Sequence, residues 1–316
     1  MSPAGKLGAF ALVLGVALGG GAAVGNVVGP IDVDGEGGAG GHATGGHGGH
    51  ETPGAPAAAS DAGQTIPGGL QVSQGGYTLA PERTVLDGAL DSAFRFRIDG
   101  PDGTAVRDFE LSHERELHLI VVSRDLQTYA HLHPTRDRSG TWSVDLPALA
   151  PGTYRALADF SVTDGPEVTL GVDLTVPGTV RSTPLPPAAA TATVDGYEVA
   201  LAGTPVAGSE SEVTLTVSRG GQPVTDLDPY LGAAGHLVAI RSGDLAYLHV
   251  HPLDEADRAN GPEVRFAIEV PSPGDYRLFF DFARRGQVRT AAFTVHVPAE
   301  GHAGEHDDHT TTQEEQ

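Results

Sequence analysis

The chain contains no cysteine, and Met1 is its only methionine among 316 residues. Without thiols it cannot form disulfides, zinc–thiolate sites, iron–sulfur clusters or a thiolate nucleophile. The lack of sulfur ligands also excludes a soft Cu(I) site. Any metal must therefore be held by nitrogen and oxygen.

Positive charge is scarce as well. The chain has 19 Lys and Arg against 41 Asp and Glu, which gives a formal net charge of −22, and Lys6 is its only lysine. An acidic surface repels the phosphate backbone, so we expect no nucleic-acid partner and favour cations. The sequence also shows no phosphate-binding loop, no HExxH motif and no Ser-His-Asp order, and we expect no enzymatic activity.

One long apolar run, residues 7–28, follows Lys6 and precedes Gly29-Pro30. Its length can cross a bilayer, and the charge before it places Met1 in the cytoplasm. We therefore predict a membrane anchor at residues 1–30 and a single-pass protein of the cell membrane, with its C-terminal domains outside the cytoplasm. The alternative is a cleaved signal peptide, which would make the protein secreted.

Composition divides the chain after residue 30 into polar segments and folded domains. Residues 31–66 are rich in Gly and His and residues 298–316 are acidic and His-rich, so both are predicted to be disordered. Their histidines either capture metal weakly or have no function.

A Pro/Ala linker at 179–192 separates two predicted domains, 67–178 and 193–297. Short apolar runs between turn residues predict an all-β fold of two tandem β-sandwiches. Strands are expected near residues 93–98, 117–123, 141–146, 154–160, 212–218, 263–270 and 276–282.

The two domains are copies of one another. HLIVVSRDLQTYAHLHP at 118–134 matches HLVAIRSGDLAYLHVHP at 236–252, and PGTYRALADF at 151–160 matches PGDYRLFFDF at 273–282. A feature present at the same place in both copies is therefore not a local accident of one stretch of sequence. Tyr154 and Tyr276 follow Pro-Gly turns in both copies and are predicted to be core or corner tyrosines. Trp142 is expected in the core of the first domain.

Histidines dominate the first repeated motif. Histidines two apart on a strand project from one face, which suits a single metal ion. If residues 124–125 and 242–243 form two-residue turns, the upstream histidine lies opposite the first of each pair, and Ser-Gly fits such a turn better than Arg-Asp. A bulge in one hairpin remains an alternative. We predict three metal ligands per domain: His118, His131 and His133 in the first, and His236, His249 and His251 in the second.

Asp159 and Asp281 occupy equivalent places in the Tyr-Arg-x-x-x-Asp-Phe strands and are candidate fourth ligands. Solvated or ion-paired strand aspartates are the alternative. The alternative is that the histidines are semi-buried structural residues, because apolar residues and a tyrosine share their face. His113 has no counterpart in the second copy, where Leu231 aligns with it, and is expected to be incidental.

Imidazole and carboxylate ligands suit Cu(II), Zn(II) or Ni(II), with Cu(II) favoured by intrinsic affinity. The repeated motifs and the Gly/His-rich tail resemble a group of actinobacterial exported or membrane-anchored proteins. Their domains are similar to immunoglobulin-like modules of the YtkA and copper-resistance protein C type. That resemblance implies metal handling, although the free N-terminal histidine of the copper-resistance module has no equivalent behind the apolar leader.

Together these features predict an extracytoplasmic protein that binds, buffers or delivers a divalent metal, copper before zinc or nickel. Its expected partners are the metal ion, the membrane and metal-transport proteins of the envelope. The competing hypothesis is a non-catalytic structural or interaction module of the cell envelope whose histidines are structural.

Overall fold

The computed structural model describes residues 66–87, 93–248, 250–253 and 260–299. Within these ranges the regular secondary structure is β, and no helix long and apolar enough to cross a bilayer is found there. The predicted anchor at 1–30, the linker up to residue 65 and the tail from residue 300 lie outside the described residues.

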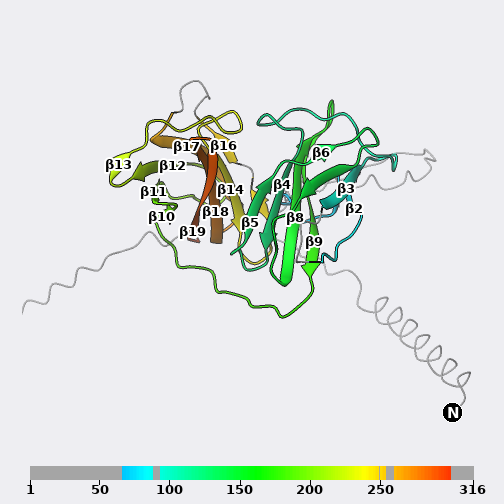
Figure 1. Cartoon of the computed structure of the whole chain (residues 1–316), viewed down its shortest axis with the longest axis horizontal. Coiled ribbons are helices and arrows are strands. Elements are labelled where there is room, and N and C mark those ends of the chain that lie inside the picture. The colour runs from blue at the N-terminus through cyan, green and yellow to red at the C-terminus, as the bar shows by residue number, and fades with distance from the viewer. Residues whose placement is uncertain (1–65, 88–92, 249, 254–259, 300–316) are drawn as a thin grey trace, which may run out of the picture. The chain divides into compact units, whose positions relative to one another are not determined.

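The first domain is a sandwich of two antiparallel sheets, drawn in blue to green in Figure 1. One sheet has the order β1 (Ser73–Gln74), β2 (Tyr77–Pro81), β3 (Ala93–Asp99), β7 (Trp142–Asp145) and β6 (Thr135–Arg136). The other has the order β5 (Tyr129–Leu132), β4 (His118–Ser123), β8 (Gly152–Ser161) and β9 (Glu167–Val176). Their facing side chains form one core that includes Phe94, Phe96 and Trp142.

The second domain repeats this arrangement. One sheet has the order β10 (Thr191–Val194), β11 (Tyr197–Ala202), β12 (Glu210–Arg219), β17 (Glu263–Glu269) and β16 (Val250–Pro252), with β13 (Gln222–Pro223) paired to β12. The other has the order β15 (Tyr247–Leu248), β14 (His236–Arg241), β18 (Gly274–Arg284) and β19 (Gln287–Val297). The chain is therefore a tandem of immunoglobulin-like β-sandwiches, as predicted.

The strands expected from sequence all form. The alternation of side chains along each strand decides which residues enter the sandwich core and which point to the opposite face. Along β8 the side chains of Tyr154, Ala156 and Phe160 enter the sandwich core, whereas Leu157 points to the opposite face. Trp142 is fully buried, as predicted. The hydroxyl of Tyr154 donates to the Ala150 carbonyl at 2.8 Å, and Tyr276 makes the equivalent bond to Ser272 at 2.7 Å. Both are the corner tyrosines expected of such sandwiches.

A third apolar cluster joins residues of both domains, and we call it the interdomain cluster. It consists of Ile120, Val122, Leu126, Leu157, Val238, Ile240, Leu245, Tyr247 and Phe279. Six of these side chains lie on the faces of β4, β8, β14 and β18 that point away from each sandwich core, whereas Leu126 and Leu245 lie in loops and Tyr247 lies in β15. Their burial explains why β4 reads as an unbroken apolar run, because both of its faces are covered.

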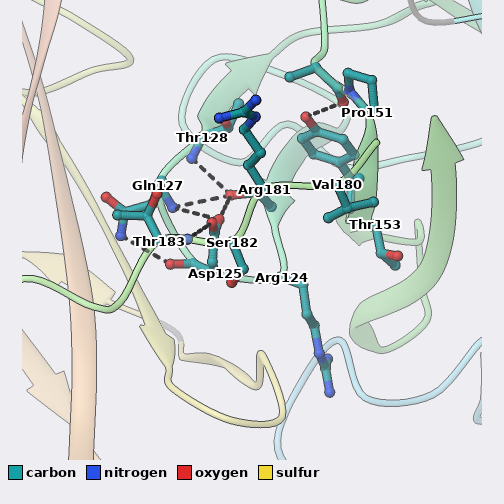
Figure 2. Close-up of a pocket in the computed structure, with 14 residues that line it drawn as sticks. Arg124, Asp125, Gln127, Thr128, Pro151, Thr153, Val180, Arg181, Ser182 and Thr183 are labelled. Atoms are coloured by element: carbon teal, nitrogen blue, oxygen red, sulfur yellow. Dashed lines mark hydrogen bonds between the residues drawn. The ribbon is translucent and has the colours of Figure 1, made fainter. Parts of the chain in front are cut away.

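The predicted hairpin register is wrong by two residues. His131 pairs with Ile120 rather than with His118, and in the second copy Tyr247 pairs with Ile240. The cause in the first copy is a wider loop, shown in Figure 2. The Ser123 hydroxyl accepts from the amides of Gln127 and Thr128, and Asp125 accepts from the Ser123 hydroxyl and the Thr183 amide. These hydrogen bonds stabilise a loop that is longer than the predicted two-residue turn.

Candidate metal centre

Three histidines of the first domain converge. His118 begins β4, His131 lies in β5 and His133 follows directly after that strand. One ring nitrogen from each lies within 4.8 Å of the other two, and this is the one group of metal-type ligands at such spacing in the described part of the chain. His118 Nδ1 and His131 Nε2 are separated by 3.0 Å. Two nitrogens on one tetrahedral ion, each about 2 Å from it, lie about 3.3 Å apart.

The outer nitrogens of this pair face acceptors. His118 Nε2 lies 3.0 Å from the Ser112 carbonyl, and His131 Nδ1 lies 2.9 Å from Asp281 Oδ2. A carbonyl and a carboxylate accept hydrogens, so both outer nitrogens donate. Two neutral imidazoles carry two N–H groups, which these bonds use completely. In that case the inner nitrogens, His118 Nδ1 and His131 Nε2, present two lone pairs to each other, and either a third hydrogen shared by the pair or a metal ion between the rings satisfies both.

His133 supplies the third nitrogen. Its Nε2 atom is buried and has no hydrogen-bond partner. A buried polar atom without a partner costs free energy, and most such atoms in proteins are satisfied by protein, water or an ion. The ring centroid of His133 lies 5.2 Å from that of His118 and 4.8 Å from that of His131. An ion between the three rings would satisfy all three nitrogens at once.

Burial controls the charge of the cluster. Removal from water lowers the pKa of His118 to about 4 and that of His133 to about 3, and the neighbouring histidines add to both shifts. The same cause lowers the pKa of His236 well below its usual range. These three imidazoles are neutral at pH 7, which is the form that ligates metal.

The second copy is arranged differently. His236 begins β14 and is buried with the first-domain histidines, its ring centroid 4.8 Å from that of His131. His251 lies in β16, which pairs with β17 in the other sheet of the sandwich, and it is exposed. His249 lies outside the described residues. The described residues therefore contain one histidine cluster. It lies in the first domain, whose Arg-Asp turn fitted the predicted hairpin register less well than the Ser-Gly turn of the second.

The two candidate aspartates are equivalent in the fold but contact different groups. Asp281 accepts from His131, from the Tyr129 hydroxyl at 3.2 Å and from the Thr290 hydroxyl. Asp159 accepts from the Tyr247 hydroxyl at 3.1 Å and from the Thr169 hydroxyl at 2.7 Å. Neither belongs to the converging group, and Asp281 instead fixes the outer nitrogen of a candidate ligand.

Sequence reasoning missed His113. Its ring centroid lies 5.2 Å from that of His236 and 6.1 Å from that of His118. The alignment with Leu231 is correct, because both residues have positive φ, 47° and 54°, in equivalent turns. No periodicity could reveal His113, since it lies in a loop before β4 rather than on a strand.

A family match covers both domains. Residues 71–178 and 192–299 each match the domain of unknown function DUF8832. The chain belongs to this family. The two DUF8832 domains correspond to the two sandwiches, and no curated protein sequence matches the chain.

Solved structures resemble the DUF8832 tandem only at the level of β-sandwich architecture. Domains 4 and 5 of the S-layer protein SbsC are 11% identical, with 65% of this chain and 91% of that chain covered and a TM-score of 0.23. A two-domain fibronectin type III segment of chicken tenascin is 8% identical over 69% of this chain and 97% of that chain, with a TM-score of 0.21. The match to a longer SbsC structure covers only 23% of that protein. These scores carry no functional argument.

Proposed function

We propose that this protein binds one divalent cation through His118, His131 and His133, and that it buffers or delivers the ion without turnover. The observation that carries the proposal is the buried, unpartnered Nε2 of His133 beside the facing nitrogens of the other two rings. Three imidazole nitrogens within 4.8 Å of one another form the kind of ligand set that divalent copper, zinc and nickel prefer. Among these, Cu(II) is favoured by intrinsic affinity.

The location and partners belong to the same proposal. The apolar run at residues 7–28 would hold the DUF8832 domains outside the cytoplasm, as a membrane anchor or as a leader that is later removed. In that compartment the protein would receive the ion from, or pass it to, envelope metal-transport proteins. The histidines near both ends, three in 42–50 and three in 302–309, would act as weak collecting sites.

The test must separate the folded site from these six histidines. A full-length chain with His42, His47, His50, His302, His306 and His309 all replaced by Gln is titrated with Cu(II) and with Zn(II) by calorimetry. We expect uptake of one ion per chain, abolished by His118→Gln. His296→Gln is the matched control, because His296 is exposed and pairs with Asp275. Absence of stoichiometric uptake of either metal would refute the proposal.

A structural function is the second candidate, and specific contacts favour it. Tyr129 bonds Asp281 and Tyr247 bonds Asp159, so equivalent residues of the two domains exchange equivalent hydrogen bonds. Such reciprocity is typical of a self-complementary interface. Under this hypothesis the histidines serve to hold two sandwiches as a rigid module of the envelope. Loss of folding in His118→Gln without any metal uptake by the parent chain would support it.

A further inference from the structure

The cluster is shared between the two domains. His131 Nδ1 bonds Asp281 of the second domain, and both side chains are almost fully buried, with 3% and 2% exposure. His236 of the second domain lies among the first-domain histidines, with ring centroids 4.8 Å from His131 and 5.5 Å from His118. The candidate metal site therefore takes groups from β5 and β4 and from β14 and β18.

The ring of His236 lies 4.8 Å from that of His131 and 5.5 Å from that of His118, although its nitrogens fall outside the group that converges within 4.8 Å. The ring centroids of the three converging histidines lie 4.8 to 5.2 Å apart. Two imidazoles on one tetrahedral ion have centroids about 5 Å apart, since each nitrogen lies about 2 Å from the metal. His236 is held by β14 on the same face as Val238 and Ile240, which belong to the interdomain cluster. Its position is therefore set by the packing of one domain against the other.

We infer that the ion binds across the two domains, with His236 as a fourth ligand and Asp281 as the residue that positions His131. This inference rests on the proposed metal site. A bound ion then links the two sandwiches at the edge of the interdomain cluster, since its ligands come from β4, β5 and β14. Asp281 keeps the hydrogen of His131 on Nδ1 and so directs Nε2 to the ion, as outer carboxylates do for ligating histidines.

The fold offers a matched control for each residue. Asp159 is the counterpart of Asp281 and is buried by the same kind of contacts, but it accepts from Tyr247 and Thr169 instead of a histidine. Asp159 lies opposite His118 across β4 and β8, but its hydrogen bonds come from Tyr247 and Thr169, so Asp159→Asn perturbs the same interface without removing a hydrogen bond from a candidate ligand. Tyr129→Phe removes another bond to Asp281 and leaves His131 Nδ1 in place.

The experiment compares five full-length chains that carry the six Gln replacements described above: the parent, His236→Gln, Asp281→Asn, Asp159→Asn and Tyr129→Phe. Cu(II) affinity is measured by calorimetry and the coordinated nitrogens are counted from the superhyperfine splitting in electron paramagnetic resonance. We expect His236→Gln to lose one coordinated nitrogen and both His236→Gln and Asp281→Asn to bind Cu(II) about 10- to 100-fold more weakly. Asp159→Asn and Tyr129→Phe should bind within about 3-fold of the parent.

A second readout tests the link between the domains. Cu(II) should slow amide hydrogen exchange in β14 of the parent, and this protection should be lost in His236→Gln even at saturating metal. If the parent binds Cu(II), His118→Gln abolishes binding, and His236→Gln binds with the parent's affinity and nitrogen count, then the ion is confined to the first domain and the inference is wrong. That result would leave the metal-binding function intact, whereas failure of the parent to bind would overturn both.

Discussion

The two DUF8832 domains share one motif and one topology, yet their histidines end in different places. In the first domain β5 runs to Leu132 beside β4 before the chain crosses to pair β6 with β7 in the other sheet. In the second, β15 ends at Leu248, and β16 begins pairing with β17 in the other sheet at Val250. The earlier crossing carries His251 away from β14. Equal sequence spacing therefore does not bring equivalent residues to one point, because the point of crossing decides which sheet holds them.

The largest expected effect tests this difference between the two domains directly. His133→Gln should weaken Cu(II) binding at least about 100-fold, because it removes a ligand nitrogen, whereas His251→Gln should change the affinity less than about 2-fold. Calorimetric titration of the two variants, both with the linker and tail histidines replaced, gives the measurement. Equal losses in the two variants would show that the copies are functionally equivalent despite their different strand crossings.

Acidification should act on the first domain's histidines. The lowered pKa values of His118 and His133, about 4 and about 3, lie below the usual 6.5 of an unfolded chain. Above pH 6.5 both states are neutral. Between pH 6.5 and about 4 the unfolded chain takes up protons that the folded protein does not, so the free energy of unfolding decreases as pH falls.

We therefore expect the melting temperature of the metal-free protein to drop by roughly 10 °C between pH 7 and pH 4. Differential scanning calorimetry across that range provides the measurement. In the double variant His118→Gln, His133→Gln the drop should be clearly smaller. An unchanged pH dependence in that variant would mean that other groups control acid stability.

The reciprocal tyrosines allow a finer comparison. Tyr129→Phe leaves Asp281 with two donors, His131 and Thr290, whereas Tyr247→Phe leaves Asp159 with Thr169 alone. Losing a hydrogen bond to a buried carboxylate costs about 1–3 kcal/mol. We expect Tyr247→Phe to lie near the upper end of that range and Tyr129→Phe near the lower end, as measured by urea unfolding. The reverse order would show that His131 does not support Asp281.

The smallest expected effect lies at the corner tyrosines, where the copies agree. Tyr154→Phe and Tyr276→Phe each remove one bond to a backbone carbonyl, and each should lower the free energy of unfolding by about 1 kcal/mol. Urea unfolding of both variants measures it. A difference of more than about 1 kcal/mol between them would assign a larger contribution to the Ser272 hydroxyl, which lies 3.3 Å from the Tyr276 hydroxyl.

The sequence by itself determined the two β-sandwiches, the corner tyrosines and the buried Trp142. These features depend on local alternation and turn residues, which act over a few positions. The same reasoning identified His118, His131 and His133 as a converging group, because two strands joined by a short loop must be neighbours. It gave the wrong register, since hydrogen bonds accepted by Ser123 and Asp125 hold a wider loop.

Only the tertiary structure decided which domain's histidines meet. The repeat suggested two independent sites, but β4, β8, β14 and β18 bury their outer faces in the interdomain cluster, and this packing brings His236 and Asp281 to the first domain's histidines. His113 joins them from a loop with no sequence period. Packing of one domain against another depends on whole faces rather than on neighbours in the chain, so no local pattern could specify it.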